Sequence, residues 1–286
     1  MPAPSPLPAL PVTSILPELL RRLEHDPGVV LIAPPGAGKT TRVPPALLDA
    51  PWLAGQRILM LEPRRLATRA AARRMAQEHG ETVGETFGYR VRLESKVSAR
   101  TRVEVITEGI LTRRLHDDPG LDGVGCVILD EFHERGLDGD LAFALLRDIQ
   151  DALRPDLRLV VMSATLDGAA VARLLPGASV LESQGRQFPV AVRHLERPAP
   201  RALPETLARV IADVLDEEPG SVLAFLPGER EIRATQAALA AQRLPASVSV
   251  RPLYGALPAT DQDAALAPAP RAPARWCWPP TSPKPA

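Results

Sequence analysis

Several charged and hydroxyl side chains of this chain stand directly after short apolar runs, where a folded protein could use them in chemistry. The run VVLIAP comes before PGAGKTT, in which Gly38, Lys39 and Thr40 open a helical pattern. Backbone N–H groups of a glycine-containing loop at a helix N-terminus bind phosphate. We expect Lys39 to reach the β and γ phosphates of a nucleotide without packing in the core, and the Thr40 hydroxyl to bind Mg²⁺.

The predicted phosphate-binding residues are contiguous in the sequence: Pro35, Gly36, Ala37, Gly38, Lys39, Thr40 and Thr41. The strict form of such a loop has glycine at its first position, where this chain has Ala33. An ordinary strand–turn–helix junction is the alternative interpretation. Gly-Lys-Thr-Thr stands where the strand–loop–helix context requires it, which favours a phosphate loop and predicts ATP as the cofactor.

A second group follows the apolar run of VILDEFHER. Asp130 and Glu131 come at the C-terminal end of a buried strand, the edge at which open α/β sheets bind ligands. Asp130 suits Mg²⁺, partly through water, and Glu131 suits positioning or polarising an attacking water. His133 beside this pair is a further catalytic candidate, although a lone histidine after a strand is usually solvated.

Alternating apolar runs and helical patterns indicate how these residues are positioned. Each short buried strand is followed by a helix, which predicts an α/β fold with a parallel sheet covered by helices on both faces. Five such strands are expected: 29–34, 57–63, 103–107, 124–131 and 158–165.

The pattern weakens near residue 177, and a second, shorter α/β unit follows. In it we expect strands at SVLAFLP (221–227) and SVSVRPLYG. Residues 1–11 carry five prolines and predict a disordered or extended lead-in.

Composition excludes some classes of function. The 34 Lys and Arg residues balance the 34 Asp and Glu residues, so any nucleic-acid-binding surface must be local. No segment approaches the ~20 apolar residues of a membrane span. Cys126 and Cys277 match no metal or redox spacing, which is typical of a reducing cytoplasm.

Five motifs in order carry a resemblance to a known family: APPGAGKTT, LEPRR, TEGIL, DEFHER and SAT. They resemble motifs I, Ia, Ib, II and III of the superfamily 2 DEAH-type helicases, and the DEFH spelling is similar to the bacterial HrpB-type ATP-dependent RNA helicases. The resemblance covers roughly residues 12–267. It implies tandem RecA-like P-loop NTPase domains, the first at 12–185 and an incomplete second at 186–267.

The resemblance also implies roles for further residues. Ser163, Ala164 and Thr165 of the SAT motif would couple hydrolysis to domain movement. Single-stranded RNA or DNA would be held through its phosphates by Arg64, Arg65, Thr107 and Arg113. The other arginines of the helix after LEPRR, which are Arg69, Arg73 and Arg74, are expected to form a solvated helix face.

Segments resembling the family's motifs V (ATNIAETS) and VI (QRxGRxGR) do not occur in the chain. The tail 268–286 has seven prolines and the cluster Trp276-Cys277-Trp278. We expect it to be disordered and out of frame, because its shifted reading frame permits VLATNIAETS; a proline-rich tail is the alternative.

Three functions remain open from the sequence. The first is a helicase that couples ATP hydrolysis to RNA or DNA strand separation. The second is a P-loop NTPase switch without unwinding. The third is a fragment that binds nucleotide and nucleic acid without turnover, although a binder needs no water-activating Glu131.

Overall fold

The computed structural model describes residues 10–164, 168–185, 190–194 and 203–267. The chain divides into two compact units, Met1–Pro189 and Val190–Ala286. Thr165 and the tail 268–286 lie outside the described residues, so the predictions for them stay predictions. The lead-in predicted at 1–11 lies outside as well, except for its last two residues, of which Pro11 begins a 3₁₀ helix.

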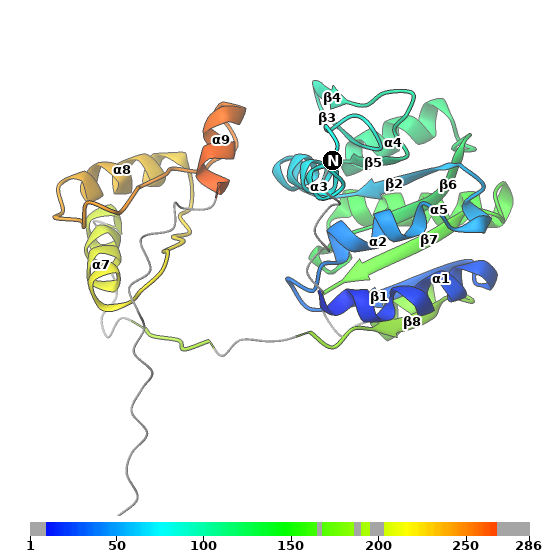
Figure 1. The fold of residues 1–286 in the computed structure, drawn as a ribbon, viewed down its shortest axis with the longest axis horizontal. Helices are drawn as coiled ribbons and strands as arrows, with labels where there is room; N and C mark the ends of the chain where they lie inside the picture. Colours follow the sequence, from blue (N-terminus) through cyan, green and yellow to red (C-terminus); the bar gives the residue numbers. More distant parts are fainter. Residues whose placement is uncertain (1–9, 165–167, 186–189, 195–202, 268–286) are drawn as a thin grey trace, which may run out of the picture. The chain divides into compact units, whose positions relative to one another are not determined.

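The first unit is built on one eight-stranded sheet with the order β4-β3-β5-β2-β6-β7-β1-β8 (Figure 1). All neighbouring strands are parallel except the β3–β4 pair. The strands are β1 (Gly28–Ile32), β2 (Arg57–Leu61), β3 (Phe87–Val91), β4 (Glu94–Lys96), β5 (Val103–Ile106), β6 (Val124–Leu129), β7 (Arg158–Ser163) and β8 (Ser179–Glu182). The five expected strands are confirmed, and β3, β4 and β8 extend the sheet at its edges.

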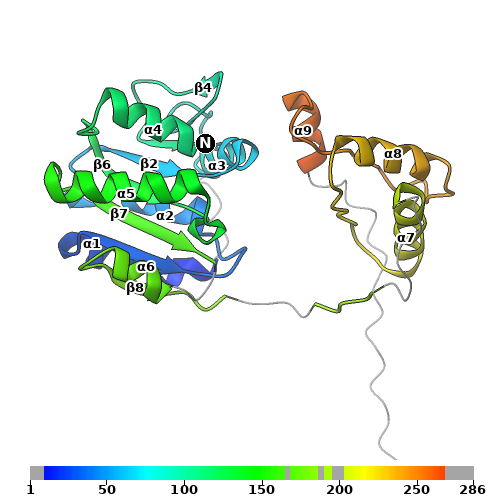
Figure 2. The ribbon, with the colours of Figure 1, turned by 180° about the vertical axis from the view of Figure 1, so that it is seen from behind.

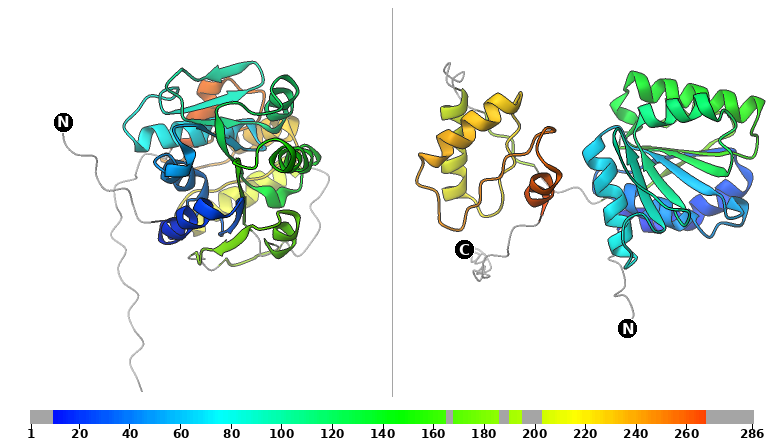
Figure 3. Two further views of the ribbon diagram at one scale, coloured as in Figure 1. Left: turned by 90° about the vertical axis from the view of Figure 1, so that its right-hand side faces the viewer. Right: turned by 90° about the horizontal axis from the view of Figure 1, so that it is seen from above.

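Helices cover both faces of this sheet, as the sequence predicted (Figures 2 and 3). One face packs against η1 (Pro11–Ile15), α1 (Leu16–His25), α2 (Lys39–Leu47) and α3 (Arg65–Glu78). The other face packs against α4 (Glu108–Asp117), α5 (Leu137–Ala152) and α6 (Gly168–Leu174). Short 3₁₀ turns, η2 (Pro51–Leu53) and η3 (Phe132–Glu134), complete the unit.

The alternation of side chains along each strand explains the two cores. On β1, Val29 and Leu31 join the cluster under α1 and α2, whereas Val30 and Ile32 join the cluster under α5 and α6. Successive side chains of a strand point to opposite faces, so a strand buried on both faces must be apolar throughout. The continuous run GVVLI satisfies this requirement.

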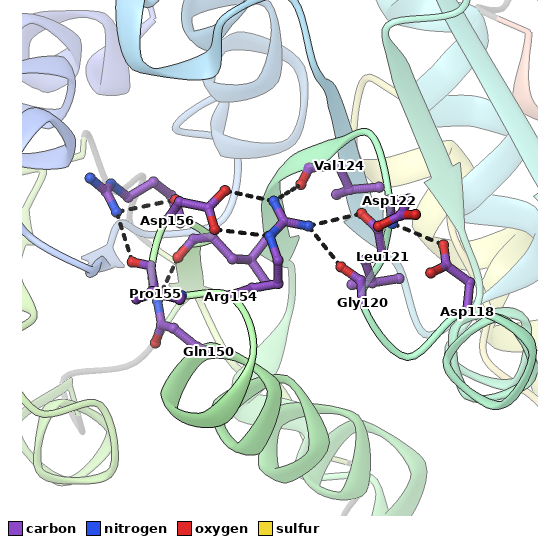
Figure 4. Close-up of polar contacts among 11 residues, drawn as sticks. Asp118, Gly120, Leu121, Asp122, Val124, Gln150, Arg154, Pro155 and Asp156 are labelled. Atoms are coloured by element: carbon purple, nitrogen blue, oxygen red, sulfur yellow. Dashed lines mark hydrogen bonds and ion pairs between the residues drawn. The ribbon is translucent and has the colours of Figure 1, made fainter.

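At the end of the sheet where β6 and β7 begin, Arg154 joins the segment that leads into β6 to the segment that leads into β7 (Figure 4). Its guanidinium donates to the carbonyl oxygens of Gly120 (2.7 Å), Leu121 (3.2 Å) and Val124 (3.0 Å). It also forms two hydrogen bonds with Asp156, at 2.9 and 2.7 Å. The hydrogen-bonded Arg154 lowers the pKa of the Asp156 carboxyl.

The described part of the second unit contains α7 (Leu203–Glu217), α8 (Glu229–Ala240) and α9 (Ala259–Leu266). A small core of Ala208, Ile211 and Leu239 lies between α7 and α8. The expectation of strands at 221–227 and in SVSVRPLYG was wrong, because the described residues there form no strand. Leu223 and Phe225 are 74% and 88% exposed. An extended segment becomes a strand only when a neighbour pairs with its backbone.

No helix among the described residues is long and apolar enough to cross a membrane.

Candidate active site

The phosphate loop between β1 and α2 has the backbone that the sequence predicted. Gly36 and Gly38 have φ values of 77° and 93°, a left-handed region that strongly favours glycine. Ala33 is not among the residues with positive φ, so its conformation does not require glycine. Its N–H donates to the carbonyl of Ser163 on β7, 3.0 Å away. The alanine at position 33, where the strict motif has glycine, therefore causes no backbone strain.

Lys39, the first residue of α2, is only 4% exposed. Its Nζ donates a 2.7 Å hydrogen bond to the Ala33 carbonyl oxygen, so the ammonium is held within the loop. Lys39 was expected not to pack in the core; its side chain is buried, and its hydrogen bond is to the loop. Of the other predicted loop residues, Pro35 and Gly36 are exposed, Ala37 is buried, and Thr40 and Thr41 are half-buried.

Thr40 and Asp130 come together as predicted, although ninety residues separate them. The Thr40 hydroxyl donates to Asp130 Oδ2 at 2.6 Å. Burial raises the pKa of Asp130 to about 6, against the hydrogen bond from Thr40. A carboxylate in this position is stabilised by a cation, and hydroxyl and carboxylate oxygens are ligands that Mg²⁺ prefers.

These two oxygens fit the way proteins hold Mg²⁺ beside nucleotides. The part of the chain that the structure describes has no cluster of three or more His, Cys, Asp or Glu side chains that could hold a metal alone. Mg²⁺ at such sites is bound by one or two protein oxygens and by the phosphates of the substrate. Thr40 and Asp130 would supply the protein's share.

Glu131 is the residue before η3 and has a left-handed conformation, with φ 50°. A non-glycine residue rarely adopts this conformation, and such residues cluster at functional sites. Its Oε2 lies 3.4 Å from His133 Nε2, and His133 Nδ1 accepts from the Ala164 N–H at 3.3 Å. His133 thus links Glu131 to the end of β7, where the neighbouring Ser163 is buried.

Of the residues predicted to bind nucleic acid, Arg64 and Arg65 lie at the start of α3 and Thr107 at the start of α4, next to the same sheet edge. Arg113 lies further along α4, in its second turn. Arg64 is 71% exposed and contacts Glu134 Oε1 through Nη2 at 2.6 Å. Arg65 and Arg113 are exposed, and Thr107 is the half-buried residue before α4. Their phosphate contacts stay a prediction.

The remaining arginines of α3 do not all form the expected solvated face. Arg69 is 9% exposed, and its Nη1 lies 3.1 Å from Glu94 Oε2 on β4, so the expectation was wrong for this residue. Arg74 is 57% exposed and pairs with Glu78. The spacing of apolar residues along a helix does not predict such pairs, because the partner of Arg69 lies on another element.

Sequence reasoning missed Glu62, the residue that follows β2. Its side chain is buried, with 4% exposed. Burial, followed by the negative charges of Asp130 and Glu131, raises the pKa of Glu62 to about 8. The signal was present in RILMLEP, where a glutamate directly continues an apolar run.

A small cavity of about 110 Å³ lies at the ends of β2 and β6, lined by residues that include Leu61, Glu108 and Glu131. Ligand pockets have volumes of roughly 300 Å³ or more, so this cavity is too small for a nucleotide.

After β8, the last strand of the first unit, the chain runs beside the phosphate loop. The N–H of Ser183, just after β8, donates to the Ile32 carbonyl at 2.8 Å. Two residues later, a Cβ on Gly185 would lie 2.0 Å from Cγ of Pro34. The Gly185 backbone therefore lies directly against the loop.

A family model for the DEAD/DEAH box helicase matches residues 13–174, which contain the phosphate loop, Asp130, Glu131 and His133. The chain belongs to this family. It is 51% identical over 263 residues to the ATP-dependent RNA helicase HrpB of Escherichia coli K12, covering 92% of this chain and 32% of that protein. It is 35% identical over 270 residues to the probable ATP-dependent RNA helicase DHR2 of Saccharomyces cerevisiae, covering 91% and 36%.

Solved structures give the same result. The crystal structure of the E. coli DEAH/RHA helicase HrpB matches with a TM-score of 0.84 at 50% identity, covering 92% of this chain and 33% of that one. A structure of the E. coli DExH-box NTPase HrpB matches with a TM-score of 0.74. This DEAD/DEAH chain spans about a third of the length of the relatives it matches.

Proposed function

We propose that this chain carries the ATP-hydrolysing part of a DEAH-type RNA helicase of the bacterial HrpB type. The hydrogen bond between Thr40 and Asp130 is the observation that carries the proposal, because it joins the phosphate loop to the DEFH segment in one site. The 51% identity to a relative described as an ATP-dependent RNA helicase supports RNA as the nucleic acid.

Each residue of the site has a distinct task in this proposal. The loop N–H groups and Lys39 would bind the phosphates of ATP, and Thr40 and Asp130 would hold Mg²⁺. Bound Mg²⁺ would neutralise charge on the phosphates. Glu131 would orient and deprotonate the attacking water, and its contact with His133 fixes the carboxylate for this task.

Nucleic acid would be bound through its phosphates at the exposed Arg64, Arg65 and Arg113, with Thr107 beside them. Arginines aimed at phosphates give binding that depends on salt and little on base sequence. The SAT residues Ser163, Ala164 and Thr165 would couple hydrolysis to domain movement, for which the contact between Ala164 and His133 offers a physical link.

Single-turnover ATP hydrolysis by the full chain, with Mg²⁺ and with or without single-stranded RNA, tests the proposal. Hydrolysis that RNA accelerates is the expected result. Binding of ATP without any hydrolysis would favour the binding fragment, and hydrolysis indifferent to RNA would favour the NTPase switch. Absence of ATP binding would contradict all three. A fluorescence strand-separation assay on an RNA duplex then tests unwinding.

A further inference from the structure

An ion pair inside the first unit joins the helix after the phosphate loop to the helix that begins at the predicted nucleic-acid contacts. Arg42 Nη1 of α2 lies 2.9 Å from Glu78 Oε2 of α3, and the side chains are 8% and 6% exposed. Glu78 Oε1 also accepts from Arg74 Nε at 2.6 Å. The first turn of α2 is thereby tied to the last residue of α3.

Arg42 also packs on the phosphate loop itself. Its N–H donates to the Gly38 carbonyl at 2.9 Å. A Cβ built on Gly38 would lie 3.4 Å from Arg42 Cγ and 2.6 Å from Leu10 Cδ1, so both side chains lie against the bare backbone of Gly38. The aliphatic part of the Arg42 side chain therefore contacts the loop, and its guanidinium contacts α3.

Stability is a poor explanation for this arrangement. Nε and Nη2 of Arg42 are buried and have no hydrogen-bond partner among the described residues. A buried donor left unpaired costs about 1–3 kcal/mol. Replacing a buried ion pair with apolar side chains of similar volume is often neutral or stabilising. A charged side chain at this position is therefore better explained by what it connects.

The helix that Arg42 holds leads to the other candidate site. α3 runs from Arg65 to Glu78, and Arg64 is the residue before its first turn. Its fourteen residues form one uninterrupted helix, so a displacement of Glu78 is carried to Arg64 and Arg65. Contiguous contacts thus run from Gly38 through Arg42 and Glu78 to the start of α3.

We propose that Arg42 is a positioning residue that couples nucleotide binding at the phosphate loop to single-strand binding at the start of α3. The inference rests on the proposed function, since it requires both ligands to bind. The coupling is reciprocal: RNA must change the affinity for nucleotide by the same factor as nucleotide changes the affinity for RNA.

The test measures the dissociation constant of a fluorescent non-hydrolysable ATP analogue with Mg²⁺, with and without saturating oligouridine, on the full chain. We expect RNA to change this constant by about fivefold or more in the wild type, at the lower end of measured couplings. In Arg42→Met the factor should fall to near one. Affinity for each ligand alone should stay within about threefold, because Arg42 lies outside both predicted contact sets.

Two control variants separate coupling from folding. Arg42→Lys keeps a cation and should retain part of the factor. Arg147→Met removes a partly buried arginine that pairs with Asp151 on α5 at 2.8 Å, and it should leave the factor unchanged. A merely structural role for Arg42 would lower the melting temperature without changing the factor.

An unchanged factor in Arg42→Met overturns the inference, as does a wild type that binds both ligands with a factor of one. If Arg42→Met does not fold, Glu78→Gln takes its place, and a preserved factor in that variant overturns the inference equally. A wild type that binds no nucleotide refutes the proposed function, and the inference with it.

Discussion

The imidazole of His133 accepts a hydrogen bond at Nδ1 from the backbone N–H of Ala164, 3.3 Å away. An accepting Nδ1 places the proton of the neutral ring on Nε2, which faces Glu131 Oε2 at 3.4 Å. The end of β7 thus orients the His133 ring. The ring in turn orients the carboxylate of Glu131, the proposed base.

Replacing His133 by alanine should leave ATP binding intact and slow single-turnover hydrolysis by about 10- to 100-fold, since small misplacements of a catalytic group have costs of this order. His133→Gln, which keeps a side-chain acceptor, should lose less. Equal hydrolysis rates in wild type and His133→Ala would show that the ring does not position Glu131.

Lys39→Ala should weaken binding of ATP strongly, because the variant lacks the only side-chain cation in the predicted loop. Since Lys39 is buried, the matched control is Lys39→Met, which keeps the volume and removes the charge. Both variants should lose affinity while circular dichroism shows a retained fold. Wild-type affinity in Lys39→Met would contradict the assignment of the phosphate loop.

Glu131→Gln should bind ATP and Mg²⁺ as the wild type does and fail to hydrolyse, because the amide keeps the shape but cannot accept a proton. Chromatography of the nucleotide recovered from the protein distinguishes ATP from ADP. Recovery of ADP at the wild-type rate would mean that another group activates the water.

Glu62 and Asp130 predict how stability depends on pH in the absence of Mg²⁺. Both carboxyl pKa values are raised in the fold, to about 8 and about 6, so these two carboxyls bind more protons in the folded state than in the unfolded state above pH 4. Stability should therefore fall as pH rises from about 4 to 8. Urea unfolding at several pH values measures this, and Glu62→Gln should flatten the dependence and stabilise the chain at pH 8. A decrease of stability at pH 8 in this variant would contradict the prediction.

Arg154→Ala should destabilise the first unit by about 2 kcal/mol, since it removes the guanidinium that donates to three carbonyl oxygens and to Asp156. Nucleotide affinity in the folded variant should not change, because this network lies where β6 and β7 begin, whereas the loop follows the end of the parallel strand β1. Thermal unfolding and nucleotide titration, done on the same sample, check both statements.

The sequence predicted those parts of the fold that depend on local pattern. The run VVLIAP could be assigned to a buried strand because every residue of it must face a core, and Thr40 and Asp130 could be placed together because parallel strands end at one edge. Tertiary partners could not be predicted. The pairs Arg69–Glu94 and Arg42–Glu78 join separate elements, and no spacing along the chain records them.

In the second unit, the sequence predicted strands that the described residues do not form. SVLAFLP has the composition of a strand, yet strand formation depends on a neighbour that pairs with its backbone, which composition does not describe. The burial of Lys39 and Glu62 was missed for a related reason. Charged residues are usually exposed, and functional sites are where this rule is broken.

Gly185 lies so close to Pro34 that its backbone packs directly on the proline ring. The backbone at Gly185 lies against the loop that would hold the phosphates. Glycine is the only residue that permits this approach, because any Cβ would overlap the proline ring. A larger residue at position 185 would therefore push the backbone of this residue away from Pro34.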